Sequence, residues 1–205
     1  MAVKWLKKWL NNTKTEWNNY VFRKQDLQNT ASLVFCIITI IYHKNICEVI
    51  ILWNKIKHYV IFIAIALGVG GLSALLTMGN MDIYEEIARP KLAPPGFVFP
   101  IVWTILFILM GISSARIYKS GDKWKSEALF VYFLQLAVNF FWSIFFFNLQ
   151  AFLLSFIWII ILWLLIIYMI ILFYRIDKPA GLLQIPYLIW VTFATYLTYM
   201  IYIMN

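Results

Sequence analysis

Two pairs of side chains, each four positions apart in an apolar stretch, are the residues best suited to chemistry here. Trp103 and Phe107 form one pair, and Gln135 and Asn139 form the other. Residues four apart share one face of a helix. Two rings on one face can stack against a flat hydrophobic ligand. The two amides either hydrogen-bond to a neighbouring helix or line a cavity, because an unpaired polar group in apolar surroundings is costly.

The composition determines the surroundings of these residues. Of the 205 residues, 63% are hydrophobic and 13% are charged, whereas soluble domains average about 45–50% and about 25%. A soluble core of this size cannot bury so much apolar surface. The composition excludes a soluble enzyme, a disordered tail and a disulfide scaffold, and it predicts an integral membrane protein.

The net charge of +8 does not indicate nucleic-acid binding. Nine of the seventeen Lys and Arg residues precede Tyr59, and the others lie in short stretches between apolar runs. This pattern is typical of membrane orientation and of attraction to anionic lipid headgroups. The two cysteines and two histidines have no metal-ligand spacing, so no metal site is predicted.

Charge-free runs predict an all-α bundle of five transmembrane helices. The longest run, between Glu127 and Arg175, has 47 residues, which suits two spans of about 20 residues joined by a turn at Asn148–Gln150. The five expected spans are Tyr59–Leu76, Phe97–Ala115, Ala128–Phe147, Ala151–Tyr174 and Ala180–Ile203.

The loop charges predict the orientation of this bundle. With five spans, fifteen basic residues fall on the side of the N-terminal segment, and only Arg89 and Lys91 fall on the other. Because basic loops stay in the cytoplasm, we expect the N-terminus inside and the C-terminus outside.

Residues 1–56 are expected to form a basic extension that precedes the membrane domain of residues 57–205. The extension contains one apolar run, Ala31–Tyr42, which is too short to span a bilayer. His43, Lys44 and Glu48 interrupt its continuation. We expect this run to be interfacial or re-entrant, with a poorly ordered extension as the alternative.

The stretch Arg89–Gly96 contains three prolines. Proline fixes φ and disfavours helix in the residue before it, so this stretch is predicted to be a stiff, non-helical connector. Small residues in the neighbouring spans, among them Gly68, Gly70, Gly71 and Gly111, indicate close helix packing.

At these residues the sequence resembles the tryptophan-rich sensory protein or translocator protein family (TspO/MBR, the peripheral-type benzodiazepine receptor family). The resemblance covers about Lys57 to Asn205 and rests on three blocks in family order. The blocks are Pro90-x-x-x-Pro94-Pro95 followed by Val102-Trp103, then Gln135-Leu-Ala-Val-Asn139-Phe-Phe-Trp142, and then Pro186-Tyr187-Leu-Ile-Trp190-x-x-Phe193-Ala194-Thr195-Tyr196-Leu197.

The resemblance implies a five-helix bundle, often a homodimer, with a pocket beneath the loop after the first span. It implies binding of porphyrins such as protoporphyrin IX, and of synthetic isoquinoline carboxamides and benzodiazepines. Trp103 and Trp190 would face the bound ring. By position, the implied ligand-binding residues are Tyr84, Pro94, Pro95, Trp103, Phe107, Asn139, Trp142, Trp190 and Ala194.

Two departures from the family pattern change what the resemblance implies. The family usually has Trp between the first two prolines of the loop, where this chain has Leu92, and this weakens a photochemical interpretation. The cholesterol motif of animal members needs a basic residue after its Tyr, whereas only Met, Ile and Asn follow Tyr202. The sequence therefore argues against cholesterol as a ligand.

The leading hypothesis is a membrane receptor or sensor for a tetrapyrrole, which requires no cofactor. One alternative is light-dependent degradation of protoporphyrin, with Trp103 and Trp190 as the redox pair, which the resemblance to some bacterial members of the family implies. Another is passive transport of a hydrophobic ligand, since the expected spans hold no acidic or basic residue that could couple to an ion gradient. The expected location is a bacterial cytoplasmic membrane, with the mitochondrial outer membrane as the eukaryotic alternative.

Overall fold

The computed structural model describes Asn12, residues 30–80 and residues 83–205, and these ranges contain helices and loops without strands. The first elements are α2 (Thr30–Thr77), η1 (Met78–Asn80) and α3 (Ile83–Glu86). They are followed by α4 (Val98–Lys119), α5 (Lys125–Ser143), η2 (Ile144–Asn148), α6 (Phe152–Ile176), α7 (Lys178–Leu182) and α8 (Ile185–Met204). The predicted all-α class is confirmed.

Five helical stretches of the described chain are long and apolar enough to cross a membrane, as the sequence predicts. The stretches are Ile37–Asn80, Val98–Lys119, Lys125–Asn148, Phe152–Ile176 and Lys178–Met204. The expected turn between the third and fourth spans is present. Gln150, with φ of 51°, lies in the left-handed region there, and α6 begins two residues later.

The apolar run Ala31–Tyr42 lies within α2, which is one helix of 48 residues, and its interfacial or re-entrant placement stays a prediction. The residues His43, Lys44 and Glu48 end an apolar run, but they do not end a helix. No proline lies between Thr30 and Thr77, and the first glycine is Gly68, so nothing in the backbone chemistry breaks the helix earlier.

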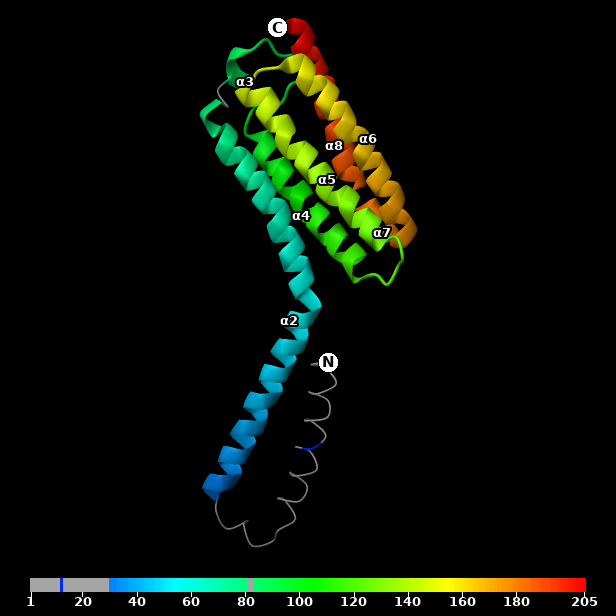
Figure 1. Cartoon of the computed structure of the whole chain (residues 1–205). Helices are drawn as coiled ribbons and strands as arrows, with labels where there is room; N and C mark the ends of the chain where they lie inside the picture. The colour runs from blue at the N-terminus through cyan, green and yellow to red at the C-terminus, as the bar shows by residue number, and fades with distance from the viewer. Residues whose placement is uncertain (1–11, 13–29, 81–82) are drawn as a thin grey trace. The chain divides into compact units, whose positions relative to one another are not determined.

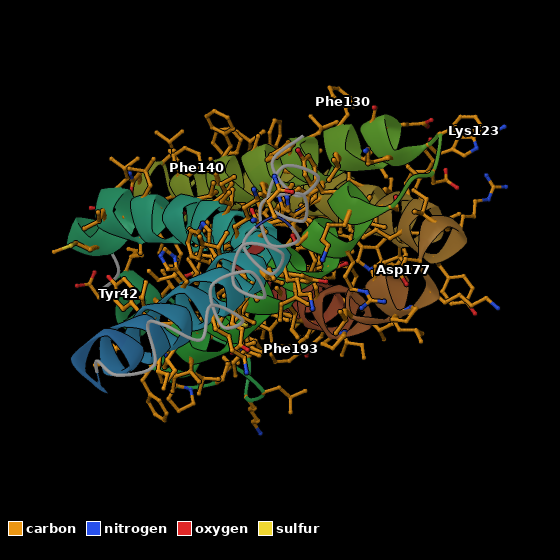
Figure 2. All side chains as sticks on the ribbon, turned by 90° about the horizontal axis from the view of Figure 1, so that it is seen from below. Tyr42, Lys123, Phe130, Phe140, Asp177 and Phe193 are labelled. Atoms are coloured by element: carbon orange, nitrogen blue, oxygen red, sulfur yellow. The ribbon has the colours of Figure 1, made fainter. Side chains whose placement is uncertain are left out.

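The chain divides into two compact units, Met1–Trp53 and Asn54–Asn205. In the second unit α4, α5, α6 and α8 lie side by side as a bundle (Figure 1). The helix α6 packs against α5, α7 and α8. Its interior side chains, such as Ile166 and Met169, are fully buried. Phe130 on α5 instead points away from the bundle (Figure 2) and is 67% exposed, as expected for a lipid-facing residue.

Two glycines allow backbones to touch inside this bundle. A Cβ on Gly111 of α4 would lie 2.5 Å from the Cα of Ile63 on α2. A Cβ on Gly181 of α7 would lie 2.7 Å from the Cα of Tyr174 on α6. The predicted close packing is therefore confirmed at Gly111, whereas Gly68 and Gly71 have no neighbouring atom within 4 Å of such a Cβ.

An ion pair joins the end of α4 to the junction between α6 and α7. The Arg116 guanidinium donates two hydrogen bonds to Asp177, from Nε to Oδ2 at 2.6 Å and from Nη2 to Oδ1 at 3.1 Å. Ser113 donates to the Ala180 carbonyl, at 2.6 Å, one helical turn earlier. Together these contacts hold α4 against α7 at this end of the bundle.

The proline-rich connector between α3 and α4 is non-helical from Ile87 to Phe97, as predicted. Tyr84 of α3 fastens the connector, because its Oη donates to the Pro94 carbonyl at 3.0 Å. The Arg89 guanidinium lies over the Tyr84 ring, with Cζ 4.9 Å from the ring centroid. These contacts hold the connector against α3.

Candidate functional site

A cavity of about 290 Å³ lies between α2, α4 and α5 in the second unit of the chain. Its wall is mostly apolar and combines large rings from α4 and α5 with small residues from α2. The lining residues are Leu67, Val69, Gly70, Gly71, Ser73, Ala74, Thr77, Phe99, Pro100, Trp103, Thr104, Phe107, Asn139, Phe140, Trp142, Ser143 and Phe147.

Aromatic rings form the α4 side of this cavity. The Trp103 and Phe107 rings lie 5.6 Å apart with an interplanar angle of 31°, so the predicted pair does share one helix face. Trp103 also meets Tyr187 of α8 edge to face at 6.1 Å. Such neighbours hold the indole in place and leave part of its surface for a ligand.

A glycine on α2 makes room for this aromatic wall. A Cβ on Gly70 would lie 2.2 Å from Cε2 of Phe107, so the ring occupies the space that any other side chain would need. The sequence identified Gly70 only as a packing residue. In the structure it determines where the Phe107 ring stands, and hence the shape of the cavity.

Buried polar groups lie behind the cavity, between α5 and α8. The Tyr187 hydroxyl donates to Gln135 Oε1 at 2.8 Å, and Asn139 Nδ2 donates to the Tyr187 oxygen at 3.4 Å. Gln135 is fully buried and Asn139 is 5% exposed. The sequence left two roles open for these amides. Both bond to a neighbouring helix, and Asn139 also lines the cavity.

Two indole N–H groups in this region have no hydrogen-bond partner within the described part of the chain. They belong to Trp142, which lines the cavity, and to Trp190, which does not. A buried donor without an acceptor costs about 1–3 kcal/mol. Trp142 is therefore a donor that a polar ligand atom could satisfy if the cavity adjusts around it.

Of the nine residues that the resemblance implies, four line the cavity: Trp103, Phe107, Asn139 and Trp142. Trp190 stands behind them, in edge contact with Phe99 at 5.8 Å. The other four do not line it, since Tyr84, Pro94 and Pro95 belong to α3 and the connector, and Ala194 is buried in α8. The roles of all nine in ligand binding remain predictions.

The sequence interpretation did not identify the contribution of α2 to the cavity. Seven lining residues come from this helix, among them Ser73 and Thr77, which are buried although their neighbours Leu72 and Leu76 are exposed. Two small polar residues four apart beside three glycines were the available signal. They mark the α2 face that turns inward.

A second depression, of about 690 Å³, lies where α6 begins and α8 ends. It is wide and shallow, and its lining includes Leu153, Ile157 and Tyr202. It lacks the enclosed aromatic wall of the first cavity, so it is a weaker candidate for a specific ligand. Among the described residues no three His, Cys, Asp or Glu side chains come together as metal ligands.

Five apolar helices and an aromatic cavity between three of them define the class, an α-helical integral membrane protein with a ligand-sized cavity. The sequence model of the TspO/MBR family matches residues 61–204. The chain belongs to the TspO/MBR family.

Relatives from three organisms show the range of this similarity. A tryptophan-rich protein TspO from Chlorobaculum tepidum is 38% identical over 126 residues, which cover 60% of this chain and 78% of the relative. The protein CrtK from Rhodobacter capsulatus is 34% identical over 150 residues, covering 71% and 91%. A translocator protein from Bos taurus is 28% identical over 134 residues, covering 63% and 79%. The similarity therefore extends from bacteria to a mammal.

Proposed function

We propose that this protein is a membrane receptor or sensor that binds a flat hydrophobic tetrapyrrole, such as protoporphyrin IX, in the cavity between α2, α4 and α5. The supporting observation is the lining, in which Trp103, Phe107 and Trp142 surround a space with one buried amide, Asn139. Flat conjugated ligands stack on such rings, and a small number of polar groups fixes their orientation.

The polar groups suit the edge of a tetrapyrrole such as protoporphyrin IX, which carries propionate carboxylates. Asn139 is held by Tyr187 at 3.4 Å, so its amide is oriented before a ligand arrives. The unpartnered indole N–H of Trp142 would gain an acceptor. Pre-oriented groups contribute more to affinity than mobile ones, because less conformational freedom is lost on binding.

The size of the cavity sets a condition on this proposal. Ligand pockets usually measure about 300–1,000 Å³, and this cavity, at about 290 Å³, is at the lower limit. A four-ring macrocycle needs more room than a single ring system. Binding of a porphyrin therefore requires part of the wall to move outward.

We also propose a bacterial cytoplasmic membrane, in which the charge distribution supports the N-terminus inside. Lys119 ends α4, Lys123 lies in the loop after it, and Lys125 and Lys178 begin α5 and α7 at the same side of the bundle, whereas Arg89 and Lys91 lie in the connector at the other. Lys123 projects from the edge of the bundle at the Asp177 end (Figure 2). With Arg116 and Arg175, six basic residues at this side outnumber its three acidic ones, Asp122, Glu127 and Asp177.

The test is a titration of the detergent-purified protein with protoporphyrin IX, followed by porphyrin absorbance in the dark and then under illumination. Trp103→Phe and Asn139→Ala should each weaken binding by about 1 kcal/mol, roughly fivefold in Kd. Trp124→Phe is the matched control, because Trp124 is 46% exposed and lies outside the cavity.

Saturable binding in the dark, weakened by the cavity variants and unaffected by the control, would support the proposal. Absence of saturable binding, or equal affinity in all variants, would contradict it. Protein-dependent bleaching to a discrete product under light would instead indicate the photochemical enzyme.

A further inference from the structure

The cavity has one wall, formed by α2, that differs from the others in how it is held. Around residues 62–66 this helix is firmly packed. Phe62 and Ala66 are buried, and the backbone of Ile63 touches α4 at Gly111. Phe62 also meets the ring of Tyr118 at 5.5 Å. This level of α2 is fixed to the bundle.

Beyond Gly70 the same helix has few anchors. Leu72, Leu75 and Leu76 are at least half exposed. Thr77 is buried, but its hydroxyl bonds to the Ser73 carbonyl of its own helix, at 2.9 Å. Ser73 is buried as well, so this end of α2 packs inward through small side chains rather than through large ones.

Asn148, the last residue of η2, makes the connection that closes this end. Its Nδ2 donates to the Leu76 carbonyl at 3.0 Å, and its Oδ1 accepts from Asn80 Nδ2 at 3.0 Å. Among the side-chain hydrogen bonds of described residues 67–80, these two cross to another element, whereas those of Thr77 stay within α2. Both are exposed, and exposed amide hydrogen bonds exchange with water at little net cost.

Three glycines separate the fixed part of α2 from the part that Asn148 holds. Gly68, Gly70 and Gly71 lie within four residues of each other, and glycine lowers the stability of a helix interior. A Cβ on Gly68 or Gly71 would have no neighbour within 4 Å. An outward bend of α2 at these glycines therefore meets no atom beside Gly68 or Gly71, and it moves Gly70 away from the Phe107 ring.

We propose that Asn148 determines the size of ligand that the cavity accepts, because its hydrogen bonds to Leu76 and Asn80 must open before α2 can bend outward at Gly68–Gly71. A ligand that fits within about 290 Å³ binds with these bonds intact. A macrocycle binds only after they open. The inference rests on the proposed function for its natural ligand.

The first experiment compares association rates of a large and a small probe in the dark by stopped flow. Protoporphyrin IX is the large probe, and naphthalene is the small one. Asn148→Ala and Asn80→Ala should each raise the association rate of protoporphyrin IX at least threefold and leave that of naphthalene unchanged. Asn54→Ala is the control, since Asn54 is an exposed amide on α2 that contacts Lys57 and lies outside the cavity. Unchanged protoporphyrin rates in both variants, or an equal rise for both probes, would overturn the proposal.

A second experiment separates this inference from the proposed function. Spin labels at Leu75 and Leu149, which are 68% and 60% exposed, report the distance between α2 and the end of η2. They are placed in a chain whose native cysteines are replaced by serine. Asn148→Ala should broaden the distance distribution toward longer values without any ligand. An unchanged distance distribution would overturn the proposal that the Asn148 hydrogen bonds hold α2 in place, whatever the protein binds. Failure of the wild type to bind protoporphyrin IX, with the broadening present, would overturn only the proposed ligand.

Discussion

The side-chain amide of Asn205 exchanges two hydrogen bonds with the backbone of Ala88. Asn205 Oδ1 accepts from the Ala88 N–H at 3.1 Å, and Asn205 Nδ2 donates to the Ala88 carbonyl at 3.1 Å. An asparagine side chain has the same donor and acceptor as a peptide group, so it pairs with a backbone as a neighbouring strand would. The contact fastens the start of the proline-rich connector to the end of α8, across 117 positions of sequence.

Replacement of Asn205 by alanine should release this connector without disturbing the bundle. The variant loses the two exposed hydrogen bonds to Ala88 and a part-buried one from Asn205 Nδ2 to the Ile201 carbonyl, and the free energy of unfolding should fall by about 1 kcal/mol. Hydrogen exchange should accelerate in peptides that contain Ala88 and remain unchanged in peptides from α6. Equal exchange at Ala88 in the wild type and the variant would contradict the role assigned to this contact.

Neighbouring glycines of α2 offer a matched comparison. Gly70→Ala should displace the Phe107 ring, because the new Cβ would lie 2.2 Å from it, and should weaken porphyrin binding by about 1–2 kcal/mol. Gly71→Ala, whose new Cβ meets no atom within 4 Å, should leave the Phe107 ring in place and should lower the affinity less than Gly70→Ala does, because it only stiffens the α2 helix. Adding Phe107→Leu to Gly70→Ala should restore thermal stability, because the shorter side chain leaves room for the methyl group. Equal affinities for the two single variants would show that the ring does not shape the site.

Removal of the Tyr187 hydroxyl should show how much its buried hydrogen bonds contribute to the stability of the protein. Tyr187→Phe leaves Gln135 Oε1 without the donor that it has at 2.8 Å, and Gln135 is fully buried. We expect a loss of about 1–3 kcal/mol in the free energy of unfolding, measured by denaturant titration in detergent. Tyr196→Phe, on the exposed side of α8, should be close to neutral. A neutral Tyr187→Phe would mean that the amide finds another donor.

The ion pair between Arg116 and Asp177 should contribute modestly and in a salt-dependent way. Its side chains are 36% and 20% exposed, so water screens their attraction. A double-mutant cycle of Arg116→Gln and Asp177→Asn should give a coupling energy of about 1 kcal/mol at low salt, decreasing as ionic strength rises. A coupling energy that does not change with salt would indicate that the pair is held by packing.

Two tryptophans that the sequence treats as equivalent should behave differently. Trp103 lines the cavity, whereas Trp190 is separated from it by Phe99, whose ring centroid lies 5.8 Å from that of Trp190. Trp103→Phe should reduce porphyrin affinity roughly fivefold, and Trp190→Phe should reduce it less than twofold. A larger effect at Trp190 would mean that the bound ring reaches past Phe99.

The five spans were predictable because long charge-free runs have few structural alternatives in a bilayer. The full length of α2 was not predictable in this way, because a helix can continue beyond the charge-free run. The charges of Lys44 and Glu48 indicate which part of α2 is in contact with water or lipid headgroups. They do not end the helix, because Lys and Glu both have a high helix propensity. The pattern of charges along the chain therefore predicts the membrane spans, but it does not predict where a helix begins.

The cavity was predictable only in part, for a related reason. In a soluble helix the polar face reveals which side is buried, but membrane helices are apolar on all sides. Polar residues such as Asn139 and Gln135 therefore revealed the inner face of α5, and the Trp103–Phe107 pair that of α4. The inner face of α2 carries only glycines and small hydroxyl residues, which are equally typical of helix packing.

The π-helical segment η2, Ile144–Asn148, makes the site depend on how the backbone is wound. A π turn holds one residue more than an α turn in the same helix. If these five residues formed a regular α-helix with the chain length unchanged, the residues after them would be rotated by about 100°. Asn148 would then point away from Leu76, although its identity and its neighbours in the sequence would be unchanged. The hydrogen bond between Asn148 and Leu76 therefore depends on the winding of η2 as well as on the two residues that it joins.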